Sequence, residues 1–323
     1  MSNIFEENGF SLLDNSYKDL EVYRKEDVLL ITLAKFKGDK KAFRQASNHL
    51  DAGLLSELSD VFDTLAGKDD VFSVILTSSH KVAFSRGAKI EVLAEATVEQ
   101  SRLFIKEAQK IILQIQRSNK PVIATINGLT LGGGLELAMA CDYRLSSDRE
   151  NVVFGLPEAS LGIIPAMGGT QNLARLVGKE RAQEIIINAR ADIFAEAAKQ
   201  YGLIDKIVPS EKLIEEAFLF AANRDLKKRD SLDLNKITVS EPSIRQRIEN
   251  YLATQTIEIV AGQKAAPMAK ALLTFLFEKA TEYTYLDGLK YEQEIFCYLQ
   301  PTSDCKEGIK ALTEERPPVF QGK

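Results

Sequence analysis

The chain is best interpreted from the stretch Pro121-Val-Ile-Ala-Thr-Ile-Asn-Gly-Leu-Thr-Leu-Gly-Gly-Gly-Leu-Glu136. Its first part, Pro121 to Asn127, is an apolar run of strand length that ends in an Asn-Gly turn signal. Three glycines, residues 132 to 134, follow, and we expect a helix from Leu131 to Ala140. Glu136 lies in the first turn of that helix. A strand that leads into a glycine-rich helix start can form a site for an anion.

The physical basis for such a site is the start of the helix. The first N–H groups of a helix have no partner within it, and they lie at the positive end of its dipole. Glycine allows a substrate to approach these groups because it has no Cβ atom. Close packing of helix on strand is an equal explanation of the glycines, and the triplet alone does not decide between the two. The segment Ala83 to Ala88 follows a predicted strand and is a candidate for a second donor or a plain loop.

Two acids are candidates for proton transfer. Glu136 is surrounded by apolar helix residues, and Glu158 follows Pro157 in another apolar stretch. Burial raises the pKa of a carboxyl group because it disfavours the charged form. When two carboxyl groups are close together, their like charges make the two pKa values differ. Such a pair performs general acid and base chemistry without histidine. The alternative, that both are solvated or helix-start charges, remains open on spacing alone.

The order of predicted elements favours an α/β fold. Buried strands are expected at 27–33, 71–77 and 121–127, and amphipathic helices at 51–65 and 98–116. This alternation is typical of parallel strands covered by helices. Later residues are mainly helical, with helices expected at 178–188, 195–201, 211–223, 244–260, 267–280 and 285–298. We therefore expect a core domain at 1–223 and a helical C-terminal region at 224–323.

Composition excludes several classes of protein. The 323 residues carry a net charge of −5, which argues against a general nucleic-acid surface. The three cysteines are scattered, which favours reduced thiols and argues against a disulfide framework. The chain has only two histidines, which argues against a metal site and a Ser-His-Asp triad. No apolar run is long enough for a membrane span, and residues 1–10 do not resemble a signal or transit peptide. We expect a cytoplasmic protein without membrane association.

The run from Pro121 to Asp142 resembles the signature of the crotonase (enoyl-CoA hydratase/isomerase) superfamily. The segments Phe154 to Gln171 and Lys306 to Phe320 are similar to further parts of that family. The resemblance implies a spiral core of ββα turns and a helical C-terminal region that builds trimers, often paired into hexamers. It also implies an acyl-CoA thioester as substrate.

The resemblance also implies specific roles for the site residues. Backbone N–H groups of Ala88 and Gly133 would form the oxyanion hole that holds the thioester oxygen. Glu136 and Glu158 together are typical of 2-enoyl-CoA hydratases: both would hold the attacking water, and Glu158 would also protonate C2. Ala166 stands where many hydratases have glycine beside the catalytic water. No metal or redox cofactor is implied, and coenzyme A enters only as part of the substrate.

The sequence departs from the family pattern at several positions. Arg86 lies within the candidate donor segment and Lys89 follows it directly; they would bind the coenzyme A phosphates or remain as solvated surface charges. Residues 35–45 form a longer, basic insertion, and residues 224–254 resemble the hydratase part of multifunctional β-oxidation proteins.

Three alternatives to a hydratase stay open. The chain could be an enoyl-CoA isomerase or a ring-opening oxo-enoyl-CoA hydrolase of the same superfamily, because these enzymes share its oxyanion hole. A non-catalytic scaffold or RNA-associated homologue is the third. The intact acid pair and the acidic composition weigh against that last alternative.

Overall fold

The computed structural model describes residues 4–14, 16–33, 48–80, 82–229, 232, 234, 238–280 and 283–323. The basic insertion predicted at 35–45 thus lies wholly outside the described residues. The chain forms two compact units, each made of three segments. The first unit comprises 1–87, 110–154 and 193–231, and the second comprises 88–109, 155–192 and 232–323. The division at residue 223 stays a prediction.

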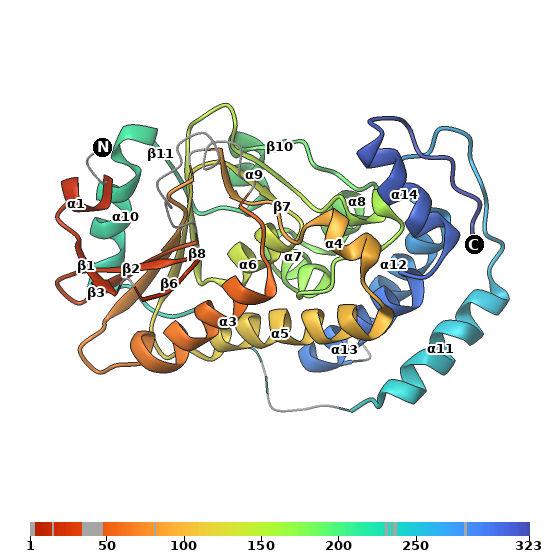
Figure 1. Cartoon of the computed structure of the whole chain (residues 1–323), viewed down its shortest axis with the longest axis horizontal. Helices are drawn as coiled ribbons and strands as arrows, with labels where there is room; N and C mark the ends of the chain where they lie inside the picture. The colour runs from red at the N-terminus through yellow and green to blue at the C-terminus, as the bar shows by residue number, and fades with distance from the viewer. Residues whose placement is uncertain are drawn as a thin grey trace. The chain divides into compact units, whose positions relative to one another are not determined.

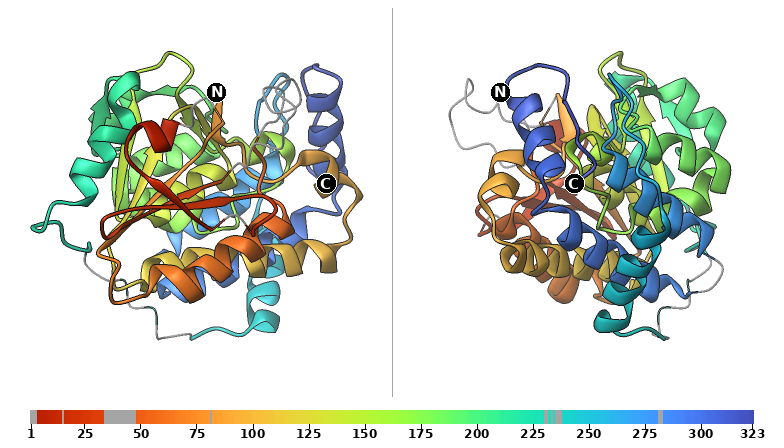
Figure 2. Two further views of the ribbon diagram at one scale, coloured as in Figure 1. Left: turned by 60° about the vertical axis from the view of Figure 1, so that its left-hand side comes forward. Right: turned by 90° about the vertical axis from the view of Figure 1, so that its right-hand side faces the viewer.

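A seven-stranded sheet forms the centre of the first unit. Its strand order is β1-β2-β3-β4-β6-β8-β11. The strands β3, β4, β6, β8 and β11 run parallel, whereas β1 and β2 join β3 as an antiparallel ribbon, drawn in red in the left view of Figure 2. The bounds are β1 (Ser11–Asp14), β2 (Glu21–Lys25), β3 (Val28–Thr32), β4 (Ser73–Thr77), β6 (Val122–Ile126), β8 (Tyr143–Ser147) and β11 (Lys206–Val208).

The parallel strands are buried on both faces. All five residues of β3, of β4 and of β6 are buried, as expected for strands with helices on both sides. Helix α10 (Leu213–Ala221) packs on β4, β6 and β8 and covers one face (Figure 1). This core contains Phe5, Phe10, Tyr23, Val28, Leu30, Ile75, Ile123, Leu145, Ile214, Ala217, Phe218 and Ala221. The predicted α/β class is therefore confirmed.

A smaller sheet of order β10-β9-β7-β5 supports the glycine-rich segment. Its strands are β5 (Ala83–Ser85), β7 (Leu129–Leu131), β9 (Val153–Gly155) and β10 (Ile193–Phe194). Helix α6 (Gly133–Ala140) follows β7 almost directly and packs on both β5 and β7. The parallel pairing of β5 with β7 brings the two candidate donor segments to neighbouring strands.

The first unit contains several further helices, and one helix has residues in both units. The first unit contains α1 (Ile4–Glu7), α3 (Ala52–Val61), the π-helical turn η1 (Phe62–Ala66), α9 (Ala195–Tyr201) and the 3-10 turn η3 (Ser210–Lys212). The long helix α5 (Val98–Arg117) contributes its first twelve residues to the second unit and the rest to the first. This helix was predicted with nearly the same bounds.

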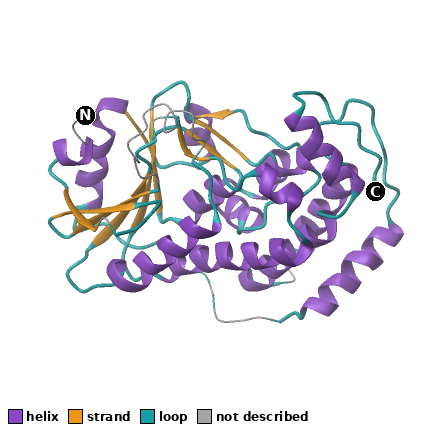
Figure 3. Ribbon diagram, in the orientation of Figure 1, coloured by secondary structure: helices purple, strands orange, loops and turns teal. Residues whose placement is uncertain are grey.

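The second unit is mainly helical, and Figure 3 draws its described residues after 238 as helices joined by loops. Its elements are α4 (Ile90–Glu95), η2 (Glu158–Leu161), α7 (Gly169–Val177), α8 (Lys179–Ile187), α11 (Glu241–Thr254), α12 (Pro267–Glu278), α13 (Tyr285–Leu299) and α14 (Ser303–Thr313). None of the helices in the described part of the chain has the length and apolar character that a membrane span needs.

One predicted helix, 244–260, ends earlier than expected. The observed helix α11 stops at Thr254, and Gln255 is extended. Residues 255–260 include several β-branched side chains, which favour helices weakly. Ile259 and Val260 are exposed, so no packing compensates for that low propensity.

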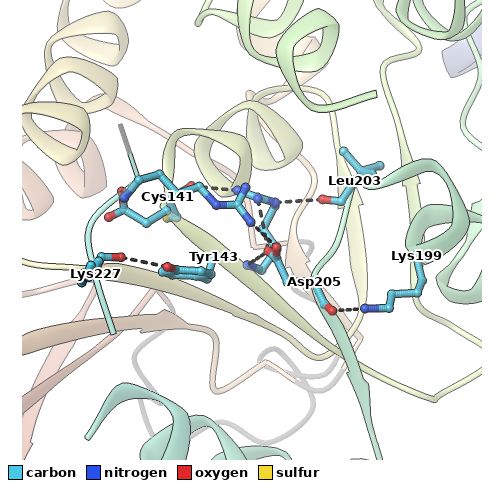
Figure 4. A network of polar contacts seen from close by, with 9 residues as sticks. Cys141, Tyr143, Lys199, Leu203, Asp205 and Lys227 are labelled. Atoms are coloured by element: carbon cyan, nitrogen blue, oxygen red, sulfur yellow. Dashed lines mark hydrogen bonds and ion pairs between the residues drawn. The ribbon is translucent and has the colours of Figure 1, made fainter. Parts of the chain in front are cut away.

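A buried arginine fixes the far end of α6. Arg144, on β8, is fully buried, and its guanidinium donates to the carbonyl of Cys141 at 2.7 Å, to that of Leu203 at 2.8 Å and to the Asp205 carboxylate at 3.2 Å (Figure 4). Burial lowers the pKa of Arg144, but a guanidinium remains charged in proteins. Cys141 ends α6, so a cation lies at the negative end of that helix dipole.

Candidate active site

The three glycines at the start of α6 have three different roles. Gly132 has a φ of 54°, and its carbonyl accepts hydrogen bonds from the amides of Leu135 at 2.8 Å and Glu136 at 3.0 Å. Gly133 is the first residue of the helix. At Gly134 a Cβ atom would lie 2.2 Å from the backbone oxygen of Ser85. Close packing of helix on strand therefore explains Gly134.

The candidate donor segments approach each other at Gly87. This residue has a φ of +76°, and a Cβ atom on it would lie 2.7 Å from the amide nitrogen of Gly133. Both glycines belong to the first unit. Ala88 follows Gly87 directly in the chain. Among the described residues, no acceptor takes a hydrogen bond from the amide of Ala88 or of Gly133. These amides therefore remain available to an external oxygen atom.

Glu136 is a buried acid of the first unit. Glu136 is only 2% exposed, and it lies in the first turn of α6 between the buried residues Leu135 and Leu137. The dipole of the helix favours a negative charge at this end. Glu136 is therefore not a solvated surface charge, whereas the other form of the alternative, a helix-start charge, agrees with its place in the first turn of α6.

Glu158 is the corresponding acid of the second unit and is 9% exposed. It begins the 3-10 turn η2, against which α14 packs. A Cβ atom on Gly308 of α14 would lie 2.7 Å from the backbone of Leu161, so the helix approaches this turn closely. The amide of Ala266 also donates to the carbonyl of Ala159 at 2.8 Å. These contacts hold the turn from two sides.

Ala166 is buried in the loop between η2 and α7. Two residues that sequence analysis missed hold this loop. The side chain of Gln109 donates to the Ala166 carbonyl, and Glu292 accepts hydrogen bonds from residues 168 and 170. The sequence did indicate a special role for Gln109, because this polar residue lies on the apolar face of its helix, four residues after Ile105 and three before Ile112. A polar side chain on such a face needs a partner.

Arg86 and Lys89 have exposed side chains. Neither forms an ion pair with a residue in the described ranges. Their charges are therefore available to a phosphate group.

A cavity of about 610 Å³ lies within the second unit. It is lined by α14 and by the segment 93–98, together with the end of α13. Cys305 lines it, but burial raises the pKa of this thiol to about 12, so the thiol stays protonated and is a poor nucleophile. Because α14 also packs on η2, one helix connects this cavity with the turn that carries Glu158.

Fold and site together define an α/β protein with a glycine-rich helix start and two buried acids. The chain belongs to the enoyl-CoA hydratase/isomerase family, which it matches over residues 40–257. The predicted membership of the crotonase superfamily is thus confirmed.

Individual relatives agree with this family. The chain is 32% identical over 276 residues to a probable mitochondrial enoyl-CoA hydratase of Dictyostelium discoideum, covering 85% of this chain and 84% of the relative. It is 30% identical to the 2,3-dehydroadipyl-CoA hydratase of Escherichia coli, covering 94% and 99%. The crystal structure of an enoyl-CoA hydratase from Bacillus anthracis matches with a TM-score of 0.57 at 29% identity, covering 95% and 100%. The crotonase-like fold is confirmed.

Proposed function

We propose that this protein hydrates 2-enoyl-CoA thioesters. Water adds across the C2–C3 double bond: its oxygen bonds to C3, and a proton is delivered to C2. The observation that carries this proposal is the approach of Gly87 to the Gly133 amide within the first unit. Ala88, the next residue in the chain, supplies the second donor of the proposal. Membership of the enoyl-CoA hydratase/isomerase family supports an acyl-CoA substrate.

The amides of Ala88 and Gly133 form the oxyanion hole of this proposal. As water attacks C3, negative charge develops on the thioester oxygen. Preorganised N–H donors stabilise that charge without reorganising during the reaction, and the loss of one donor typically costs roughly 3–4 kcal/mol in the barrier. The N-terminal end of α6 adds its dipole to the same effect. We expect no metal or redox cofactor, because these donors polarise the thioester.

The two glutamates manage water and protons. Glu136 and Glu158 hold the attacking water. Glu136 assists as base and takes a proton from the water as its oxygen bonds to C3, while Glu158, protonated at the start, delivers its own proton to C2. A proton that passes from Glu136 to Glu158 through solvent restores both acids. Both are largely withdrawn from solvent, which strengthens their electrostatic effect on the reacting atoms. The buried amide of Ala166 donates to the same water.

Exposed cations and the second-unit cavity support binding of the rest of the substrate. Arg86 and Lys89 bind phosphate groups of coenzyme A, because neither is neutralised by a described carboxylate. The cavity beside α14 receives the acyl chain, because its wall includes the apolar residues Leu93, Val98 and Ile309. Its volume falls in the range of small-molecule sites.

A spectrophotometric assay tests the function. Crotonyl-CoA loses its conjugated absorbance when it is hydrated. Glu136→Gln and Glu158→Gln should each lower kcat by about 10²- to 10⁴-fold, because each removes one proton-transfer group. Near wild-type turnover in either variant would disprove the two-acid mechanism.

With the parent protein, the same assay distinguishes a hydratase from an isomerase and from a non-catalytic scaffold. An isomerase would leave crotonyl-CoA unchanged but would raise the absorbance of a 3-enoyl-CoA by moving its double bond into conjugation. A non-catalytic scaffold would turn over neither compound.

A further inference from the structure

The amide of Ala166 is the feature from which we argue. Ala166 is 5% exposed, and its N–H donates to no acceptor in the part of the chain that the structure describes. A buried backbone amide nearly always has a hydrogen-bond partner, often an ordered water. Ala166 lies eight residues after Glu158 in the second unit. Under the proposed function this amide donates to the water that adds to the substrate, so the orientation of the amide would set the position of that water.

Gln109 fixes the carbonyl side of Ala166. Its Nε2 atom donates to the Ala166 carbonyl at 2.8 Å and to the Leu289 carbonyl at 2.9 Å. The side chain projects from α5 and is 8% exposed. One amide group thus ties the loop to both α5 and α13. Rotation of the backbone at Ala166 would break the first bond and leave a buried carbonyl unsatisfied, which costs free energy.

Glu292 fixes the next turn of the same loop. Its carboxylate, fully buried on α13, accepts from the amide of Gly168 at 2.6 Å. It also accepts from the amide of Thr170 at 2.9 Å and from its hydroxyl at 2.5 Å. The carboxylate lies at the N-terminal end of α7, where the helix dipole stabilises a negative charge. The loop is therefore held on both sides of Met167.

We propose that Gln109 and Glu292 are positioning residues that orient the Ala166 amide so that its N–H binds the water added to the substrate. The inference rests on the proposed hydratase function. Neither side chain touches the reacting atoms. They act through the Ala166 backbone. The addition of water therefore depends strongly on Gln109 and Glu292, whereas the proton transfer at C2 depends on them less.

Two reactions of the same enzyme separate these effects. Hydration of crotonyl-CoA requires a positioned water. Exchange of the C2 protons of butyryl-CoA with D2O requires the oxyanion hole and Glu158 but adds no water to the substrate. Gln109→Met keeps the size of the side chain and removes the donor. We expect it to lower kcat for hydration about tenfold to a hundredfold, because small displacements of a reacting group have effects of this size. KM and the proton exchange should change little.

Glu292→Gln is a second variant, in which the side chain keeps its shape but has fewer hydrogen-bond acceptors. It should also lower kcat for hydration and change the proton exchange little. Gln114→Met is the matched control, because it makes the same change on the same helix but removes a bond to Asp63. Circular dichroism checks that each variant folds.

Each outcome is decisive. If Gln109→Met hydrates at the parent rate, or loses hydration and exchange in equal proportion, the positioning role is overturned. If the parent catalyses neither reaction, the hydratase proposal itself fails. If the parent hydrates and only the variants lose hydration, both proposals stand.

Discussion

Gly87 and Gly178 both have positive φ values, +76° and +82°, but they lie in different surroundings. A Cβ atom at Gly178 would meet nothing within 4 Å, whereas one at Gly87 would lie 2.7 Å from the Gly133 amide. Substitution at Gly178, whose ψ is 158°, therefore adds backbone strain alone, of about 1–3 kcal/mol. Substitution at Gly87 adds a collision at the proposed oxyanion hole as well.

This difference gives a prediction at the residue scale. Gly87→Ala should lower kcat for hydration by about 10²- to 10³-fold, because a displaced amide can no longer donate to the oxyanion. Gly178→Ala is the matched control and should reduce thermal stability while it leaves kcat near the parent value. Steady-state kinetics with crotonyl-CoA and a thermal melt measure both effects. Equal kcat values in the two variants would contradict the assigned role of Gly87.

At the scale of elements, the start of α13 depends on a single carboxylate. Asp287 forms a capping box with Thr284, and it accepts hydrogen bonds from the amide of Thr238 at 2.7 Å and from its hydroxyl at 2.5 Å. Burial of Asp287 opposes its ionisation, but hydrogen bonds from Thr238 and Thr284 outweigh burial and lower its pKa to about 2. Asp287 thus joins the helix to the chain segment that precedes α11.

The lowered pKa predicts a pH dependence. The folded-state pKa lies below the ordinary value of 3.8, so the stabilisation is complete above about pH 4 and is lost as the pH falls through about 2. Asp287→Asn should lower the free energy of unfolding at pH 7 by about 2 kcal/mol. Urea unfolding at several pH values measures this quantity. The difference between parent and variant should shrink between pH 4 and 2; a constant difference would rule out ionisation as its cause.

Elements differ in how far local sequence predicts them. The strands β3, β4 and β6 and the helix α5 were predicted within about two residues, because long apolar patterns define them. The strands β5 and β7 have three residues each, too few for a pattern. Helix α7 has no side-chain cap of its own, and Glu292 stabilises its start from 122 positions away in the sequence. Local sequence does not contain that information.

At the scale of the whole molecule, ionic contacts join distant segments of the first unit. Asp205 pairs with the buried Arg144 of β8 and also with Arg229. Figure 4 shows Asp205 together with Cys141 and Leu203, which supply carbonyls to the same network. This network connects the end of α6 with β8 and β11. It therefore supports the helix on which the proposed oxyanion hole depends.

Asp205→Asn should destabilise the protein strongly, because it leaves a buried guanidinium without its counter-charge. The expected loss is about 3 kcal/mol in the free energy of unfolding. Asp192→Asn is the comparison: it removes a largely exposed partner of Arg190, which should cost less than about 1 kcal/mol. Denaturant unfolding measures both changes. Similar losses in the two variants would show that the network contributes little.

Assembly and location belong to the same scale and remain predictions. The family resemblance predicts a trimer or a hexamer, which light scattering of the purified protein would determine. The predicted cytoplasmic location also stays a prediction.

The sequence by itself determined the family, the α/β alternation and the identity of the two acids, because these follow from local patterns and from a specific motif. Only the tertiary structure decided which glycine packs on a strand and which one lies beside the Gly133 amide. It also identified Gln109 and Glu292 as the residues that hold the loop of Ala166. The physical reason is the same in each case: these contacts join residues tens to hundreds of positions apart, and chain folding alone brings them within hydrogen-bond distance.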